Sequence, residues 1–187
     1  MRIRPAAASD AAAIADIYAH YVRETVITFD TDPPSTAEMA ERIASGGDLY
    51  PWLVAEEDGA LLGYAYAAAF RTRRAYRFAV ETTVYLRPGS QGRGLGSALY
   101  RPLLETLETQ GFTQAIAAIT LPNEASVRLH ERLGFTDAGT YRQVGWKLGQ
   151  WLDVGLWQRR LAHPGIPPPE PRPFDSPSAS SSPSDLP

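Results

Sequence analysis

Six consecutive residues give this 187-residue chain its clearest chemical signature, Gln91-Gly92-Arg93-Gly94-Leu95-Gly96. They follow a β-branched and aromatic segment, 82–86, and open a segment with the apolar spacing of an amphipathic helix, 95–110. A glycine-rich turn from strand into helix presents backbone N–H groups at the positive end of the helix dipole. Such a turn can bind a phosphate or pyrophosphate, although the same residues could form a turn that is only structural.

Two side chains outside this turn could transfer protons. Glu81 lies in the context Ala79-Val80-Glu81-Thr82-Thr83-Val84, where an ionised carboxylate is expected to have a partner or a chemical purpose. It could therefore be a general base or one half of a structural ion pair. His130 lies on a predicted helix, where its spacing alone allows a functional or a structural role.

Arginine supplies nearly all of the chain's basic character, since Lys147 is its only lysine. Arg71, Arg73 and Arg74 come just ahead of the segment that contains Glu81. A guanidinium group forms paired hydrogen bonds with carboxylate, phosphinate or sulfone oxygens, which suits the recognition of a small anion. The same three residues could instead form a solvated linker.

Composition narrows the classes of function. A formal net charge of −3 and a pI near 5.6 give no electrostatic argument for a nucleic-acid partner. The chain has no cysteine, which excludes disulfides, thiolate nucleophiles and cysteine-based metal sites, and no metal is expected. The N-terminus lacks the apolar segment of a secretion signal, and no run is long enough to span a membrane. We therefore expect a cytoplasmic protein without a membrane partner.

Strands and helices are predicted from apolar spacing, with no internal repeat. Strands are expected at about 3–5, 52–55, 61–70, 77–86 and 114–121, followed by two more that end near 161. Helices are expected at about 10–22, 38–44, 95–110 and 123–133. Residues 25–29 are β-prone, Asp58-Gly59 predicts a hairpin turn, and Gly145 and Gly149 are expected near the last turn.

These elements predict one α+β domain with a mixed, mostly antiparallel sheet, over residues 1–163. At 44% hydrophobic composition, the chain has enough apolar residues for one sizeable core. Residues 164–187 are rich in proline and serine and have almost no apolar content. They are therefore expected to form a disordered tail.

Several ordered motifs agree on one family. They are the segment 82–86, the signature 91–96 and the block Asn123-x-x-Ser126-x-x-x-His130-x-x-x-Gly134-Phe135. In these residues the chain resembles the GCN5-related N-acetyltransferase superfamily (GNAT). The resemblance implies an α/β/α fold, with a sheet of about seven strands that splays at the cofactor site and is flanked by helices.

Further motifs narrow the resemblance. They are similar to those of phosphinothricin N-acetyltransferases and of relatives that acetylate methionine sulfoximine or methionine sulfone. The matching residues are Tyr50-Pro51-Trp52-Leu53-Val54-Ala55-Glu56, Arg73-x-Ala75-Tyr76, Glu81-x-Thr83-Val84-Tyr85, Leu121-Pro122-Asn123 and Gly145-x-Lys147-x-Gly149-x-Trp151-x-Asp153-Val154-Gly155. The resemblance covers about residues 3–161. It implies direct transfer of an acetyl group from acetyl-CoA to the α-amino group of a small amino-acid analogue.

The resemblance also implies where the cofactor binds. The pyrophosphate would lie on the backbone of 92–97, and the pantetheine would pair with the backbone of 84–86 and meet the Asn123 amide. Asn123 could equally be a helix N-cap, and Arg93 could face solvent. The implied cofactor residues are Val84, Tyr85, Leu86, Gln91, Gly92, Arg93, Gly94, Leu95, Gly96, Ser97 and Asn123.

Catalytic and acceptor-binding residues follow from the same resemblance. Glu81 is implied as the general base. His130 stands where much of the superfamily has a tyrosine, and it would serve the departing thiolate or orient Glu81 or substrate, with Tyr85 as the second candidate for the acid. The implied substrate-binding residues are Phe29, Arg71, Arg73, Tyr76, Glu81 and His130. A homodimer is implied as well, and the region 146–157 is unusually aromatic, which could also be ordinary core.

Three other functions fit parts of the pattern. The acceptor could be a protein N-terminus or a polyamine, but a polyamine site would need acidic residues where the chain has arginines. The chain could be a catalytically silent acyl-CoA-binding module, although it has both Glu81 and His130. A nucleotide-binding protein would need the lysine of a P-loop or the acidic ribose contact of a dinucleotide fold, and neither is present.

Overall fold

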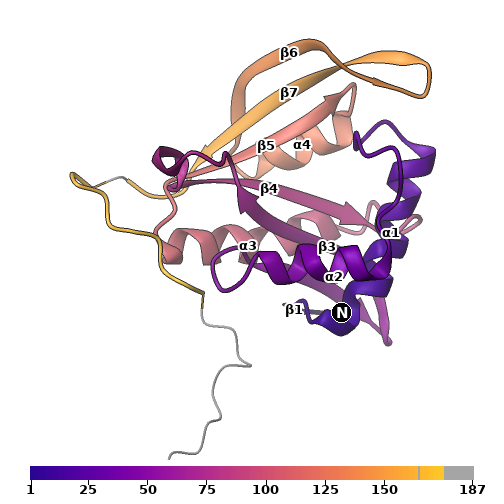
Figure 1. Ribbon diagram of the computed structural model, residues 1–187, viewed down its shortest axis with the longest axis horizontal. Coiled ribbons are helices and arrows are strands. Elements are labelled where there is room, and N and C mark those ends of the chain that lie inside the picture. The colour runs from indigo at the N-terminus through magenta and orange to yellow at the C-terminus, as the bar shows by residue number, and fades with distance from the viewer. Residues whose placement is uncertain (164, 175–187) are drawn as a thin grey trace, which may run out of the picture.

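The computed structural model describes residues 1–163 and 165–174, which form a seven-stranded sheet with helices on both faces (Figure 1). The strand order is β1-β2-β3-β4-β5-β7-β6. Neighbouring strands are antiparallel except for the pair β4 and β5, which is parallel. The strands are β1 (Arg2–Pro5), β2 (Trp52–Glu57), β3 (Ala60–Ala69), β4 (Ala79–Leu86), β5 (Gln114–Leu121), β6 (Thr136–Lys147) and β7 (Gln150–Arg160). The predicted α+β class and its mixed, mostly antiparallel sheet are confirmed.

The helices form two layers on the sheet. They are α1 (Ala11–Glu24), α2 (Thr36–Ser45), α3 (Leu95–Gln110) and α4 (Glu124–Arg132), with short 3₁₀ turns η1 (Ala8–Asp10) and η2 (Arg74–Tyr76). Residues of α1 and α2 share one buried cluster with Trp52, Tyr64 and Tyr85, while α3 and α4 contribute to a second cluster on the other face. In the part of the chain that the structure describes, no helix has the length and apolar character needed to cross a membrane.

Successive side chains of β4 pack on opposite faces of the sheet. Val80, Val84 and Leu86 pack in the cluster with α3, while Tyr85 packs on the side of α1 and α2. Because successive side chains of a strand point to opposite faces, Glu81 lies on the same face as Tyr85. The position of Glu81 in β4 therefore places its carboxylate on the α1–α2 side of the sheet.

Strands β4 and β5 separate soon after they begin. They pair only from Ala79–Gln114 to Glu81–Ile116. Beyond Glu81, the edge of β4 that faces β5 has no strand partner, as the splayed ribbons of Figure 1 show. The parting of these two strands provides an opening in the sheet with Glu81 at its start.

Two local predictions need correction. Residues 25–29 form bends and no strand, because their hydrogen bonds go to side chains of β5 and β6 and to the end of α1 and form no strand ladder. Gly149 lies in the turn between β6 and β7 together with Leu148, as predicted, whereas Gly145 lies inside β6. The hairpin turn at Asp58-Gly59 is where it was predicted.

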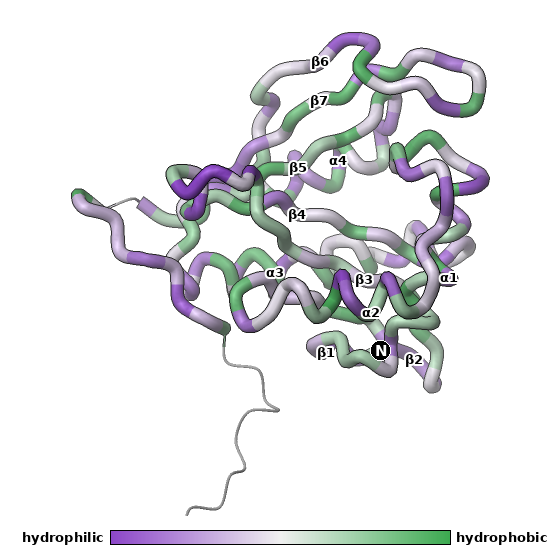
Figure 2. Tube along the Cα trace, viewed as in Figure 1, coloured by the Kyte–Doolittle hydropathy of each residue, from purple (hydrophilic) through white to green (hydrophobic). Residues whose placement is uncertain are grey.

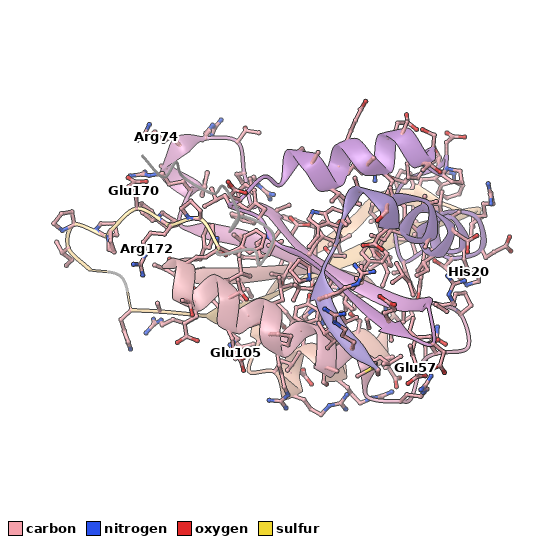
Figure 3. The ribbon with its side chains drawn as sticks, turned by 90° about the horizontal axis from the view of Figure 1, so that it is seen from below. His20, Glu57, Arg74, Glu105, Glu170 and Arg172 are labelled. Carbon is pink, nitrogen blue, oxygen red and sulfur yellow. The ribbon has the colours of Figure 1, made fainter. Side chains whose placement is uncertain are left out.

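The C-terminal segment 165–174, expected to be disordered, has defined contacts with the domain. The Arg172 N–H donates to the Gln110 carbonyl and the Phe174 N–H to the Asp48 carbonyl, both at 2.8 Å. Glu170 accepts from the Arg77 guanidinium at 2.6–3.0 Å. Figure 3 shows Glu170 and Arg172 beside the loop that carries Arg74. The tail prediction for residues 164 and 175–187 lies outside the described residues.

Candidate active site

A glycine-rich turn leads from β4 into α3, as the sequence predicts. Gly94 is the N-cap of α3 with a φ of 77°, and no side chain caps this helix end. The first N–H groups of α3 are therefore not bonded by a capping side chain and can meet an anion. A cavity of about 510 Å³ lies in front of them.

This cavity collects the predicted cofactor residues. All of them except Arg93 line it, together with residues of α4. The Arg93 guanidinium instead donates to the Glu57 carboxylate at 2.7 Å. Arg93 therefore faces solvent in this structure, which is one of the two possibilities that the sequence allowed. Asn123 lines the cavity, and its Oδ1 also accepts from the Ser126 N–H at 3.2 Å. It is therefore both the N-cap of α4 and a residue of the cavity.

Two basic residues of the cavity were not predicted from the sequence. Arg128 and Arg132 of α4 line the same space as the glycine-rich turn. They are spaced i and i+4, so one helix face presents both cations toward the place where phosphate charge is expected. That spacing was the available signal, but it indicates a site only once the direction of α4 is known.

The edge of β4 is partly occupied. The Tyr21 hydroxyl donates to the Leu86 carbonyl at 2.6 Å and lies 3.3 Å from the Leu86 N–H. Both main-chain groups of Leu86 are thus engaged, although Leu86 lines the cavity. Because alternate residues of a strand direct their N–H and C=O groups to the same side, Val84 is the better placed residue to pair with a pantetheine amide.

Glu81 lies where β4 and β5 separate, and its side chain is half-buried. Burial raises the pKa of the Glu81 carboxyl above its ordinary value, and the nearby charge of Arg71 offsets part of this rise. Among residues 1–163 and 165–174, no hydrogen bond or ion pair involves this carboxylate. The structural ion pair considered from the sequence is therefore not formed in the described chain, and the group is available as a base.

His130 is buried, with 3% of its surface exposed, and both ring nitrogens have partners. Nδ1 lies 2.8 Å from the Ser126 carbonyl and therefore donates, which leaves Nε2 to accept from the Tyr100 hydroxyl at 2.9 Å. Burial lowers the pKa of His130, so the ring is neutral at pH 7. This geometry favours a role in holding the site together over a free acid. Tyr100 was not found from the sequence because nothing marks it apart from other buried residues of α3.

Tyr85 lies between the cavity in front of the glycine-rich turn and the opening in the sheet. It lines both the large cavity and a narrow cleft of about 50 Å³ that also contains His130 and Thr83. Burial raises the pKa of the Tyr85 hydroxyl well above its ordinary value, so the group keeps its proton at neutral pH. Tyr85 is therefore the better placed of the two candidate acids.

Residues 25–30 form a loop over the site, and Phe29 is its exposed aromatic side chain. Lys147 Nζ donates to the Thr28 carbonyl at 2.7 Å and lies 3.4 Å from the Tyr21 carbonyl. The ring of Phe29 lies against the backbone of Gly145, where an added Cβ would overlap it. The β6–β7 hairpin thus fixes the Phe29 loop at two points.

Replacement of Lys147 by methionine tests this contact. The change leaves the Thr28 carbonyl without its buried donor, which costs about 1–3 kcal/mol of stability. Because the Phe29 loop loses an anchor, we expect the KM of the acceptor to rise several-fold while the KM of acetyl-CoA stays constant. Steady-state kinetics with thermal unfolding would measure both effects. Arg142→Met is the matched control, since Arg142 is an exposed cation on the same strand that pairs with Asp153. Equal KM changes for both substrates would contradict the assigned role.

The arginine-rich loop before β4 is mostly hydrophilic (Figure 2). Arg71 lies over the Phe70 ring at 4.4 Å and its charge reaches Glu81. Arg73 is exposed at the start of η2, and the Tyr76 ring packs edge-on against Phe70. The structure therefore brings the charge of Arg71 close to the Glu81 carboxylate, and places Arg73 and Tyr76 at the edge of the same loop.

Comparisons with known proteins agree with this arrangement. The family described as "Acetyltransferase (GNAT) domain" matches residues 3–156. The phosphinothricin N-acetyltransferase of Streptomyces viridochromogenes is 47% identical over 90% of this chain and 92% of its own. The L-methionine sulfoximine/L-methionine sulfone acetyltransferase of Salmonella typhimurium is 38% identical over 89% of this chain and 98% of its own.

A solved structure shows the same fold with a ligand. It is the phosphinothricin acetyltransferase of Sinorhizobium meliloti in complex with acetyl-CoA. It has 44% sequence identity and a TM-score of 0.83, and the match covers 86% of this chain and 88% of that one. The resemblance predicted from the motifs is confirmed, and the chain belongs to the GNAT acetyltransferase family.

Proposed function

We propose that this enzyme transfers the acetyl group of acetyl-CoA to the α-amino group of a small amino-acid analogue, of the phosphinothricin, methionine sulfoximine or methionine sulfone type. The observation that carries the proposal is the position of Glu81. Its carboxyl has no hydrogen-bond or ion-pair partner in the described part of the chain, and it lies at the parting of β4 and β5, close enough to Arg71 to be affected by its charge. The named acceptors of the relatives support the choice of acceptor class.

The proposed chemistry uses Glu81 as the base for the acceptor and Tyr85 as the acid for the leaving thiolate. Glu81 takes a proton from the acceptor ammonium, directly or through a water, which frees the nitrogen lone pair. The amine then forms a C–N bond at the thioester carbonyl while the C–S bond breaks. Tyr85 gives its hydroxyl proton to the departing thiolate, and the second proton that the nitrogen loses as the amide forms restores the Tyr85 hydroxyl. His130, neutral and bonded on both nitrogens, keeps Tyr100 and α4 in place. Arg128 and Arg132 would add positive charge beside the phosphates.

An acceptor panel tests the function directly. Free-thiol release from acetyl-CoA would be measured with phosphinothricin, methionine sulfoximine, methionine sulfone and a polyamine. We expect release with at least one of the three amino-acid analogues and none above background with the polyamine. Release with the polyamine alone would contradict the acceptor class, because a cationic acceptor would have to bind beside Arg71.

Arg71→Ala should raise the KM of the acceptor by about tenfold or more, the cost of losing a charge-assisted hydrogen bond to its carboxylate. It should also raise the pKa of Glu81 further, since Arg71 is the cation that opposes the effect of burial. The pH dependence of kcat/KM would report this shift in pKa. Arg73→Ala should raise the acceptor KM without changing the pH dependence. Arg74→Ala is the control, because Arg74 lies toward Glu170. An unchanged acceptor KM in both Arg71→Ala and Arg73→Ala would remove the loop from acceptor binding.

We also propose a homodimer that uses the β6–β7 hairpin. Trp146 and Trp151 are 57% and 60% exposed, with their rings 5.3 Å apart, so that only Trp157 of this aromatic region lies in the core. Exposed apolar patches of this kind mark protein contacts. Light scattering at micromolar concentration should give twice the monomer mass, and a monomer would contradict the proposal. The cytoplasmic location stays a prediction.

A further inference from the structure

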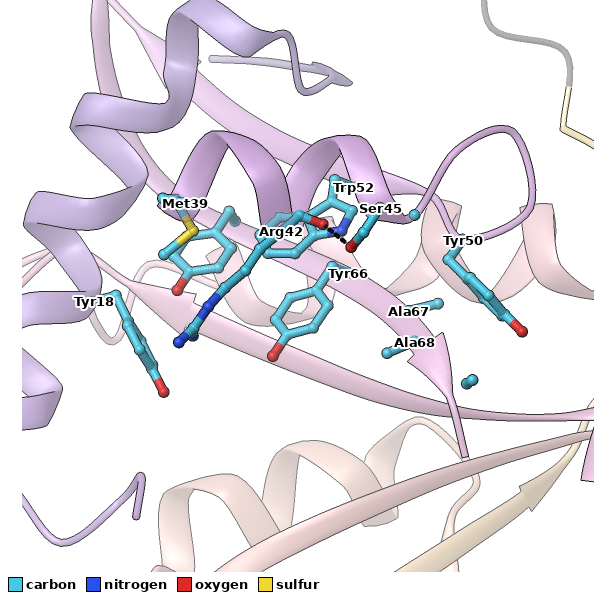
Figure 4. Close-up of a pocket in the computed structure, with 12 residues that line it drawn as sticks. Tyr18, Met39, Arg42, Ser45, Tyr50, Trp52, Tyr66, Ala67 and Ala68 are labelled. Carbon is cyan, nitrogen blue, oxygen red and sulfur yellow. Dashed lines mark hydrogen bonds between the residues drawn. The ribbon is translucent and has the colours of Figure 1, made fainter. Parts of the chain in front are cut away.

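A second cavity, of about 320 Å³, lies on the α1–α2 face of the sheet (Figure 4). Its aromatic wall consists of Trp52, Tyr64 and Tyr66. The Trp52 and Tyr66 rings are nearly parallel, with an interplanar angle of 12° and centroids 4.1 Å apart. Tyr64 continues the same stack at 6° to Trp52. Stacked aromatic rings thus form one wall of the cavity, and its volume is within the range of small-molecule sites.

Register across β3 and β4 places Glu81 beside this cavity. Ala68 lines the cavity and is the direct antiparallel partner of Glu81. Side chains of directly opposed residues lie on the same face, about 5 Å apart at Cβ. The charge of Glu81 also acts on the Tyr66 hydroxyl. An amine held at Glu81 therefore lies between the coenzyme opening on one side and the aromatic cavity on the other.

The charge of the cavity is balanced. Figure 4 shows Arg42 extending from α2 toward Tyr18 along the cavity, and its guanidinium lies 5.7 Å from the Tyr18 ring centroid. Both Nη atoms of Arg42 donate to one carboxylate oxygen of Asp30 at 3.2 Å. Because Asp30 already pairs with this cation, the cavity has no charge left over for an anionic tail. A neutral, flat, apolar group matches its walls best.

We propose that this cavity binds the side chain of a further class of acceptor, and that the enzyme acetylates aromatic L-amino acids as well as short polar analogues. The inference rests on the proposed function, since Glu81 fixes the position of the amine. Ala68 is then the residue that sets acceptor size, because its methyl group leaves the passage from Glu81 into the cavity open.

The test compares two acceptors in three enzymes. We would measure kcat/KM by thiol release with L-tryptophan and with methionine sulfone, for the wild type, Ala68→Leu and Ala60→Leu. Ala60 is exposed at the far end of the same strand and receives the same added atoms. Ala68→Leu should lower kcat/KM for tryptophan by about 10–200-fold, the range for a few methylenes in an apolar pocket. Its effect on methionine sulfone should be less than about threefold, and Ala60→Leu should change neither value.

The outcomes separate the inference from the function beneath it. A wild type that acetylates methionine sulfone but not tryptophan overturns the inference and leaves the proposed function intact. Thiol release with no amino acid at all overturns both. Equal losses of kcat/KM for the two acceptors in Ala68→Leu would show that the added side chain disturbs Glu81 and not the binding of the aromatic side chain. That result would overturn the inference. If Ala68→Leu does not fold, Ala68→Val should give a smaller loss in the same direction, and no discrimination in that variant would also count against it.

Discussion

Replacing Glu81 with glutamine should lower turnover by about 10²- to 10⁴-fold, the range for losing a general base. Glutamine keeps the shape of the side chain and removes its basicity. Since no hydrogen bond or ion pair in the described chain depends on this carboxylate, the fold should not change. Calorimetry should find acetyl-CoA binding close to that of the wild type, because Glu81 is not among the residues that line the coenzyme cavity. Unchanged turnover would exclude Glu81 as the base.

The pH profile gives the same prediction a second readout. A general base works when deprotonated, so activity should fall as pH decreases through the pKa of Glu81. Burial raises that pKa, and the fall should therefore begin above the usual range of a glutamate. In Glu81→Gln this acid limb should disappear from the residual activity. Glu105→Gln, an exposed carboxyl on α3 (Figure 3), should keep both the rate and the limb.

Gly94→Val should weaken acetyl-CoA binding by about tenfold or more. Gly94 has a φ of 77°, and a β-branched residue in this conformation costs at least about 1–2 kcal/mol. The turn can relieve the strain only by moving the N–H groups at the start of α3, and each 1.4 kcal/mol of lost binding energy is a factor of ten. Calorimetric titration with acetyl-CoA measures the loss.

The chain provides a matched control for this variant. Gly59 has a φ of 78° in the β2–β3 turn, and at both glycines an added Cβ would meet no atom within 4 Å. Gly59→Val therefore introduces the same backbone strain at a distance from the coenzyme cavity. It should lower stability comparably and leave acetyl-CoA affinity unchanged. If the two variants bind acetyl-CoA equally well, the glycine-rich turn is structural, as the sequence also allowed.

The fold was predictable where local signals and tertiary contacts agree. The capping box of Ser35 and Glu38 begins α2, and alternation along 114–121 became β5. Residues 25–29 show where this fails, since their β-prone side chains carried no information about Lys147, which binds this loop from 119 residues away. The segment 165–174 failed in the same way, because its bonds to Asp48 and Gln110 need the assembled domain.

In the candidate site, too, local features were predictable and contacts between distant elements were not. The glycine-rich turn is contiguous in sequence, so its place at the start of α3 could be predicted from spacing alone. The partners of His130 and Arg93 could not, because Tyr100 and Glu57 reach them only through the packing of separate elements. Arg71 and Arg73 are two residues apart, and only the path of the loop decides which of them lies near Glu81.

The brief pairing of β4 with β5 has a thermodynamic consequence. Main-chain bonding across the middle of the sheet is limited to three residue pairs, so the molecule has a seam between the strands that precede α3 and those that follow it. A coenzyme arm lying in this seam would supply bonds that the polypeptide does not make for itself. Ligand at about one hundred times its dissociation constant adds about 2.7 kcal/mol to folding stability. Resistance of this enzyme to unfolding and proteolysis should therefore follow the acetyl-CoA supply of the cell.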